Sequence, residues 1–158
     1  MGKNFADITH EINHYTAVKV AKRAKNEGVS KFIFASSCSA YGAGSDKPRK
    51  EIDLLNPLTD YARSKVNAET ELVELADAGF NIYCLRFATA CGASKNLRLD
   101  LVVNDFVASA LTRNKIKVLS NGEPFRPLIA VDDMALAIKG VSLAKINNKK
   151  VAKIYNVG

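Results

Sequence analysis

The spacing of apolar residues along the chain changes between a helical period and short apolar runs that are typical of buried strands. Helices are predicted over residues 8–26, 58–78, 99–113 and 132–144. Strands are predicted over residues 31–36, 82–87, 116–119 and 153–157, and a polar loop over residues 46–57. Asp132 is a candidate N-cap of the last helix. Because strands and helices alternate, the predicted fold class is α/β, with a parallel sheet flanked by helices.

The strand predicted over residues 31–36 runs directly into hydroxyl groups, in the sequence FIFASSCSAYG of residues 32–42. The next predicted helix carries Tyr61 and Lys65 one turn apart, so the phenol and the ammonium group share one face. A neighbouring cation favours the phenolate form of a tyrosine and lowers its pKa. With a serine hydroxyl to hold a substrate oxygen, such a pair can exchange a proton with a substrate. A Tyr-x-x-x-Lys sequence alone is common on exposed helices, and its pairing with the Ser-Ser strand end makes it informative.

At these segments the chain resembles the extended short-chain dehydrogenase/reductase family, which includes the NAD-dependent nucleotide-sugar epimerases and dehydratases. Further segments similar to that family are LRFATACG at residues 85–92, RPLIAVDDMA at residues 126–135 and IYNVG at residues 154–158. Asn13 stands where the family has an asparagine that opens the helix before the serine strand. The resemblance runs from residue 8 to the last residue and implies a Rossmann-type sheet.

The resemblance implies a catalytic role for three residues. Ser37 would hydrogen-bond the reacting sugar oxygen, and Tyr61 would act as general base or acid. Lys65 would lower the pKa of Tyr61 and bind the nicotinamide ribose. The cofactor, NAD or NADP, would be bound by Tyr61, Lys65, Ser36 and Asn13. For Asn13 a supporting role in its helix is the alternative.

The resemblance also implies positions that bind the substrate, a nucleotide-diphosphate sugar. These positions are Ser37, Thr89, Arg98, Asn104 and Arg126. Arg126 suits the diphosphate because a guanidinium group binds two phosphate oxygens at once. For Arg98 and Asn104 an exposed helix face is the alternative interpretation.

One feature of the family has no counterpart in this sequence. The family begins with a strand and a Gly-rich turn over the cofactor pyrophosphate, and none of the nine glycines of this chain forms such a cluster. Gly42 and Gly44 follow the serine strand but lead into a polar loop with no helix behind it. We therefore expect an incomplete Rossmann-type sheet and an incomplete cofactor site. Residues 1–92 would form the second half of the nucleotide domain, and residues 93–158 would form segments of the substrate domain interleaved with strands that return to the sheet.

Departures from the family pattern bear on the type of reaction. Sugar dehydratases of the family carry Asp-Glu just after the catalytic hydroxyl, where this chain has Cys38 and Ser39. Thr89 and Ala130 replace an asparagine and a histidine that are frequent in 4-epimerases. The expected function of the parent protein is NAD(P)-dependent epimerisation or reduction through a transient 4-keto sugar. The alternative is a truncated, catalytically inactive fragment or split-protein subunit with only an interaction role.

Composition narrows the expected partners and compartment. The net charge of +7 comes from scattered Lys and Arg residues without a zinc-finger or helix-turn-helix pattern, so we expect no nucleic-acid partner. No apolar stretch of about 18 residues suggests a membrane span, and a signal peptide is absent, so the expected compartment is cytoplasmic. Cys38, Cys84 and Cys91 lack C-x-x-C spacing and are expected to be reduced thiols, with no metal site and with Cys38 accessible.

We predict that the 158-residue chain forms a homodimer or larger oligomer, or aggregates. The strand of residues 31–36 would lie beside the first strands of the family fold, and an unpaired apolar strand edge promotes association. The helices of residues 8–26 and 58–78 commonly build a dimer interface in the family. Light scattering over a concentration series measures the association. A stable monomer at high micromolar concentration with cooperative unfolding would contradict this prediction.

Overall fold

The structure, a computed structural model, describes residues 5–43, 47–118, 121, 126–145 and 151–158 of the chain. Its helical elements are α1 (Ala6–His10), η2 (Glu11–Tyr15), α2 (Thr16–Asn26), η3 (Cys38–Tyr41), α3 (Asp60–Glu74), α4 (Val102–Arg113) and α5 (Val131–Leu143). Its strands are β1 (Lys31–Ser37), β2 (Asn81–Phe87), β3 (Thr89–Cys91), β4 (Leu128–Ala130) and β5 (Ala152–Val157). The first three helical elements form one helix with a π-helical turn at η2, whereas η3 is a short 3-10 helix.

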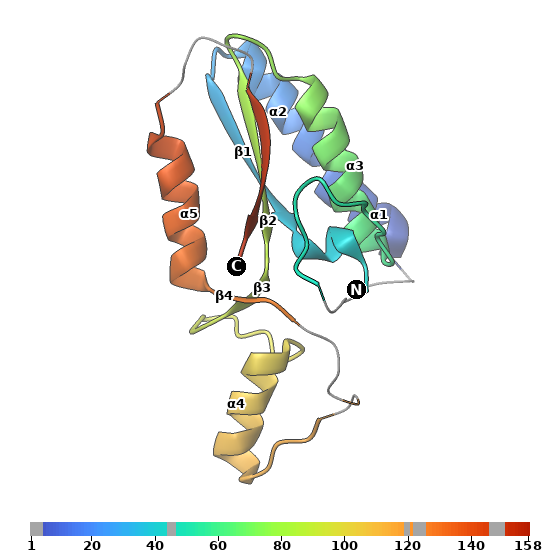
Figure 1. Ribbon diagram of the computed structural model, residues 1–158, viewed down its shortest axis with the longest axis vertical. Coiled ribbons are helices and arrows are strands. Elements are labelled where there is room, and N and C mark those ends of the chain that lie inside the picture. The colour runs from blue at the N-terminus through green and yellow to red at the C-terminus, as the bar shows by residue number, and fades with distance from the viewer. Residues whose placement is uncertain (1–4, 44–46, 119–120, 122–125, 146–150) are drawn as a thin grey trace.

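Three parallel strands form the main sheet, in the order β1-β2-β5. The helices α1, α2 and α3 lie on one face of this sheet and α5 lies on the other (Figure 1). Every residue of the central strand β2 is buried, because helices cover both faces of the sheet. The predicted parallel α/β sheet with flanking helices is confirmed.

Two apolar clusters fill the spaces between the sheet and the helices. Successive strand residues point to opposite faces, so each strand contributes to both clusters. Phe34 and Cys84 pack in the same cluster as Leu72 of α3. Leu85 and Phe87 belong to the second cluster, against which α5 packs. The packing on both faces holds β1 and β2 in place and so fixes the positions of the residues at their carboxyl ends.

A second, two-stranded parallel sheet follows the end of β2 and consists of β3 and β4. The helix α4 projects beyond this small sheet (Figure 1), and none of its residues is buried. Within the described parts of the chain, no helix is long and apolar enough to cross a membrane.

Some predicted boundaries differ from the structure. The helix predicted over residues 58–78 begins at Asp60, after Thr59 caps it, and ends at Glu74. It ends early because the carboxylate of Asp77 accepts hydrogen bonds from the N–H groups of Gly79 and Phe80, which forms a turn before β2. The prediction of Asp132 as an N-cap is wrong, since Asp132 lies in the first turn of α5 after the N-cap Ala130.

The short strand predicted over residues 116–119 is wrong for residues 116–118, which belong to no strand, while residue 119 lies outside the described residues. The side chains of Ile116 and Val118 are exposed. A strand needs a partner for its backbone hydrogen bonds, and no described strand pairs with this segment. Residue 46, at the start of the predicted polar loop, also lies outside the described residues.

We predict that Leu72→Ala destabilises the fold by about 2–5 kcal/mol, because it leaves a cavity between α3 and the sheet. The side chain of Leu72 is completely buried. The matched control is Leu111→Ala on α4, where the leucine is 79% exposed. Urea unfolding followed by circular dichroism measures both variants. Equal midpoints for the two would contradict the assignment of the core.

Candidate active site

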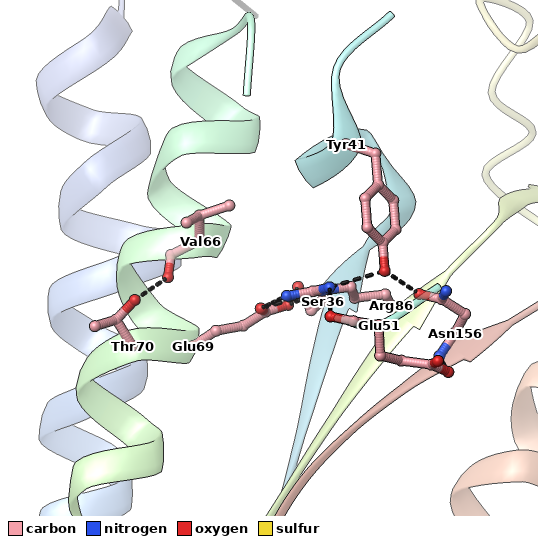
Figure 2. Close-up of polar contacts among 8 residues, drawn as sticks. All are labelled: Ser36, Tyr41, Glu51, Val66, Glu69, Thr70, Arg86 and Asn156. Atoms are coloured by element: carbon pink, nitrogen blue, oxygen red, sulfur yellow. Dashed lines mark hydrogen bonds and ion pairs between the residues drawn. The ribbon is translucent and has the colours of Figure 1, made fainter. Parts of the chain in front are cut away.

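A buried ion pair joins α3 to the central strand near the carboxyl end of the sheet (Figure 2). Arg86 of β2 donates from Nε to both carboxylate oxygens of Glu69, at 3.0 and 3.1 Å, and from Nη2 to Oε2 at 2.6 Å. The two side chains are 2% and 3% exposed. The hydroxyl of Ser36 on β1 also donates to Oε1 of Glu69. One carboxylate thus connects α3, β1 and β2.

The other end of Arg86 holds the segment that follows the serine strand (Figure 2). Its Nη1 donates to the Tyr41 hydroxyl at 2.8 Å, which donates in turn to Oδ1 of Asn156 on β5 at 2.7 Å. The N–H of Asn156 donates to the carboxylate of Glu51 at 2.8 Å and holds the pKa of Glu51 below its usual value. Burial works against the charge of Arg86, but the hydrogen bonds that Arg86 donates to Glu69 and Tyr41, together with the charge of Glu69, outweigh it and raise the pKa of Arg86.

The three predicted catalytic residues lie near one another at the end of β1. Ser37 is the last residue of this strand and the N-cap of η3. Tyr61, in the first turn of α3, lies close enough to the Ser37 side chain for the Ser37 hydroxyl to favour its phenolate form. Lys65 lies one turn further along α3, where its Nζ donates to the carbonyl of Ala35 at 2.9 Å and lies 5.7 Å from the centroid of the Tyr61 ring.

Burial dominates the electrostatics of Tyr61 in this structure. It raises the pKa of Tyr61, and the Ser37 hydroxyl and the charge of Arg98 only partly oppose this effect. The ammonium group of Lys65 is directed to the carbonyl of Ala35. Burial also lowers the pKa of Lys65. Tyr61 in this arrangement is a protonated phenol at neutral pH.

A cavity of about 650 Å³ opens beside Ser37 at the carboxyl end of the sheet. Ser37, Thr89 and Arg126, three of the predicted substrate-binding residues, line it. Its other polar lining residues are Cys38, Ser39, Tyr41, Lys47, Arg49, Arg86 and Asn156. No aspartate or glutamate is among the described residues that line it, and Lys47, Arg49 and Arg126 give it a positive charge. Such a surface suits an anionic ligand.

The sequence model of the NAD dependent epimerase/dehydratase family matches residues 3–158. The chain belongs to this family. UDP-glucose 4-epimerase of Vibrio cholerae is 39% identical to it over 82 residues, which are 50% of this chain and 25% of that protein. UDP-glucuronate 4-epimerase of Thermodesulfobacterium geofontis is 28% identical over 112 residues, 70% of this chain and 34% of that protein. The family relation expected from the sequence is confirmed.

Solved structures of family members share the fold. UDP-N-acetylglucosamine 4-epimerase from Methanobrevibacter ruminantium M1, in complex with UDP-N-acetylmuramic acid, has a TM-score of 0.77 at 26% identity, covering 92% of this chain and 46% of that chain. The ADP-L-glycero-D-manno-heptose-6-epimerase of Helicobacter pylori has a TM-score of 0.79 at 20% identity, covering 97% of this chain and 47% of that chain. The chain thus spans less than half the length of these relatives.

The residues at the end of β1 fit one end of the dinucleotide for which the family is named. The phenol of Tyr61 and the ammonium group of Lys65 provide polar groups suited to a ribose and its attached ring. Gly42, the glycine after the serine strand, has a φ of +82° and packs so closely on the carbonyl of Asn56 that a Cβ would collide with it. The missing Cβ of Gly42 therefore makes room for the backbone of Asn56. The described residues fit the nicotinamide end and provide no cradle for the pyrophosphate.

The remaining predicted site residues lie apart from the cavity. Ser36 was expected to bind the cofactor, but its hydroxyl is buried and bonded to Glu69, so it serves the ion pair instead. Asn13 is partly buried in the π-helical turn η2. Arg98 is exposed and paired with Asp100, and Asn104 donates to the carbonyl of Arg98 at 3.0 Å. These positions do not line the cavity beside Ser37.

The sequence analysis did not predict the ion pair between Glu69 and Arg86, or the place of the loop residues Lys47 and Arg49 in the cavity lining. Glu69 stands four and eight residues after Lys65 and Tyr61, so all three share one face of α3, and this spacing was visible in the sequence. Arg86 inside an otherwise apolar strand was a second visible signal, since a buried arginine requires a partner. Lys47 and Arg49 lie in a loop and gave no periodic signal. No group of His, Cys, Asp and Glu side chains suited to a metal ion occurs among the described residues.

We predict that Glu69→Gln destabilises the fold by about 3–5 kcal/mol, because it leaves the buried charge of Arg86 without a counter-ion. Replacing both partners, with Glu69→Leu and Arg86→Met, should cost less than Glu69→Gln alone. The control is Arg23→Gln, which removes an ion pair to Glu27 whose side chains are 79% and 58% exposed and should leave stability unchanged. The midpoints of urea unfolding measure the stability of all these variants. A Glu69→Gln variant as stable as the control would show that the pair does not hold the site together.

Proposed function

We propose that this chain carries the acid–base centre of a NAD-dependent epimerase, or related reductase, of nucleotide-diphosphate sugars. The observation that carries the proposal is the meeting of Ser37, Tyr61 and Lys65 at the end of β1, beside a cavity lined by cations. Polar groups at the carboxyl end of a parallel strand are where such folds bind ligands. Family membership supports the same reading.

The chain's own residues would move a proton at the reacting sugar hydroxyl. The hydroxyl of Ser37 would hold the sugar oxygen, and the oxygen of Tyr61 would take its proton as a carbonyl forms, then return it. Since burial raises the pKa of Tyr61, this phenol needs a positive charge beside it to act as a base. The ammonium group of Lys65, one turn away on α3 and 5.7 Å from the centroid of the Tyr61 ring, would supply it. NAD, when bound, would accept a hydride from the sugar carbon and give it back.

The cationic cavity would bind the diphosphate of the substrate. Its volume falls within the range of small-molecule sites, roughly 300–1,000 Å³. Arg126 lies close enough to Cys38 to favour the thiolate form, although burial dominates and raises the pKa of this thiol. A phosphate bound by Arg126 would therefore lie near the end of β1. Arg49, on the rim of the same cavity, adds a second guanidinium group.

The same lining argues against dehydration as the reaction. Elimination of water from a sugar requires a base for a ring proton and an acid for the departing hydroxyl. Carboxylates usually serve these roles, and the described lining of the cavity contains none. Cys38, the residue after Ser37, is a protonated thiol because burial raises its pKa. Epimerisation or reduction needs only the centre at Ser37 and Tyr61.

A second candidate is a role in interaction alone, which would fit the lack of a Gly-rich pyrophosphate turn in this sequence. The two candidates differ in one respect that can be measured. A catalytic centre must respond to the loss of the Tyr61 hydroxyl, whereas an interaction surface would not depend on it.

We predict that Tyr61→Phe in the full-length protein lowers kcat by a factor on the order of 10²–10⁴, with little change in KM, because only a proton-transfer group is lost. NMR assays with NAD and the nucleotide sugars of the relatives (UDP-glucose, UDP-glucuronic acid and UDP-N-acetylglucosamine) measure turnover. Tyr155→Phe, a partly exposed tyrosine on β5, is the matched control. Turnover that is unaffected by Tyr61→Phe, or absent in the wild type with all sugars, would overturn the proposal.

A further inference from the structure

Ser37 receives two hydrogen bonds from a single neighbour. Its Oγ lies 3.2 Å from the backbone nitrogen of Ser39, which donates to it, and 2.9 Å from the Ser39 hydroxyl. The same hydroxyl lies close enough to the Tyr61 side chain to favour its phenolate form. Ser39 therefore contacts Ser37 directly and can influence Tyr61 only through the Ser37 hydroxyl.

The hydrogen-bonding capacity of a hydroxyl group limits how these contacts can be arranged. A serine hydroxyl has one proton to donate and two lone pairs to accept with. The N–H of Ser39 can only donate, so it takes one lone pair of Ser37. When the Ser39 hydroxyl donates as well, the second lone pair is taken and the proton of Ser37 is left for the oxygen of Tyr61. That direction agrees with the effect of Ser37 on Tyr61, which is to favour the phenolate.

The position of Ser39 is fixed by the network around the ion pair. Ser39 lies in η3, and its carbonyl accepts a hydrogen bond from the N–H of Gly42 at 3.1 Å. Tyr41, at the end of the same short helix, is held by Arg86 and Asn156. The hydroxyl of Ser39 thus faces Ser37 from a segment that is anchored on its far side.

We propose that Ser39 is a positioning residue that makes Ser37 a hydrogen-bond donor, toward Tyr61 in the free site and toward the reacting oxygen when a sugar is bound. A sugar oxygen that loses its proton to Tyr61 gains negative charge, and a donor at Ser37 stabilises it. A Ser37 hydroxyl free to rotate would spend part of its time as an acceptor and would lose this effect. The catalytic meaning of the inference rests on the proposed function, but its test does not.

The other charged and titratable groups that face Tyr61 must be held constant in the test. They are Cys38 of η3, whose charge would raise the pKa of Tyr61, Arg98 of the loop before α4, whose charge lowers it, and Lys65 on α3 itself. A substitution at Ser39 removes none of these groups. A change in the titration of Tyr61 after such a substitution therefore reports the hydrogen bonds that pass through Ser37.

The experiment places a fluorinated tyrosine at position 61 and follows its ionisation by ¹⁹F NMR in the 158-residue chain. Fluorination brings the phenol into a mild pH range in which the fold persists, and it distinguishes this position from the other tyrosines. We expect Ser39→Ala to raise the pKa of residue 61, since Ser37 becomes a weaker donor to the phenolate. Ser39→Thr, which keeps the hydroxyl, should restore the wild-type titration. Ser142→Ala, an exposed serine on α5, is the control and should change nothing.

A double-mutant cycle separates this role from a merely structural one. Ser37→Ala should raise the pKa of residue 61 at least as far as Ser39→Ala, and adding Ser39→Ala to it should have no further effect. The inference is overturned if Ser39→Ala leaves the titration unchanged, if Ser39→Thr shifts it equally, or if Ser39→Ala still acts without the Ser37 hydroxyl. The measurement needs no turnover, so its result can still be interpreted if the activity assays overturn the proposed function.

Discussion

The ion pair between Glu69 and Arg86 is the interaction on which the carboxyl end of the sheet depends. Removing two charges from water costs several kcal/mol for each ion, and only close geometry with further hydrogen bonds offsets that cost. Here Arg86 donates three hydrogen bonds to Glu69, while Ser36 and Tyr41 occupy the remaining positions around the pair. The pair fixes the position of α3 relative to β1 and β2. Tyr61 lies two turns before Glu69 on the same face of α3, so the distance between Tyr61 and Ser37 depends on this position.

Structure and chemistry therefore occupy one face of one helix. Along α3 the phenol of Tyr61, the ammonium group of Lys65 and the carboxylate of Glu69 follow at intervals of four residues and become steadily more buried. The outermost group is suited to meet a ligand, the middle one is bonded to the carbonyl of Ala35, and the innermost one anchors the helix. A change in the buried anchor will reach the reactive phenol through a rigid helix. The polar network thus couples stability to the geometry of the site.

The parts that could be predicted from the sequence are those with a local signal. Helical and strand spacing predicted the main sheet and its flanking helices, and the resemblance around Ser37, Tyr61 and Lys65 predicted which side chains meet. The failures involve partners that are distant in sequence. Ser36 looked like a site residue because nothing local reveals Glu69 below it, 33 positions away. The apolar alternation at residues 116–118 resembled a strand, but a strand forms only where a neighbour offers its backbone.

Two contacts bring the ends of one loop together. Gly42 packs closely on Asn56, and the N–H of Asn56 donates to the carbonyl of Ala40 at 3.0 Å. Lys47 and Arg49, which line the cavity, belong to this loop, whereas Ser37 and Tyr61 lie outside it. A loop whose ends are clamped can change length and composition at small entropic cost and with little effect on its base. Changes in this loop can therefore alter the lining of the cavity while leaving Ser37 and Tyr61 in place.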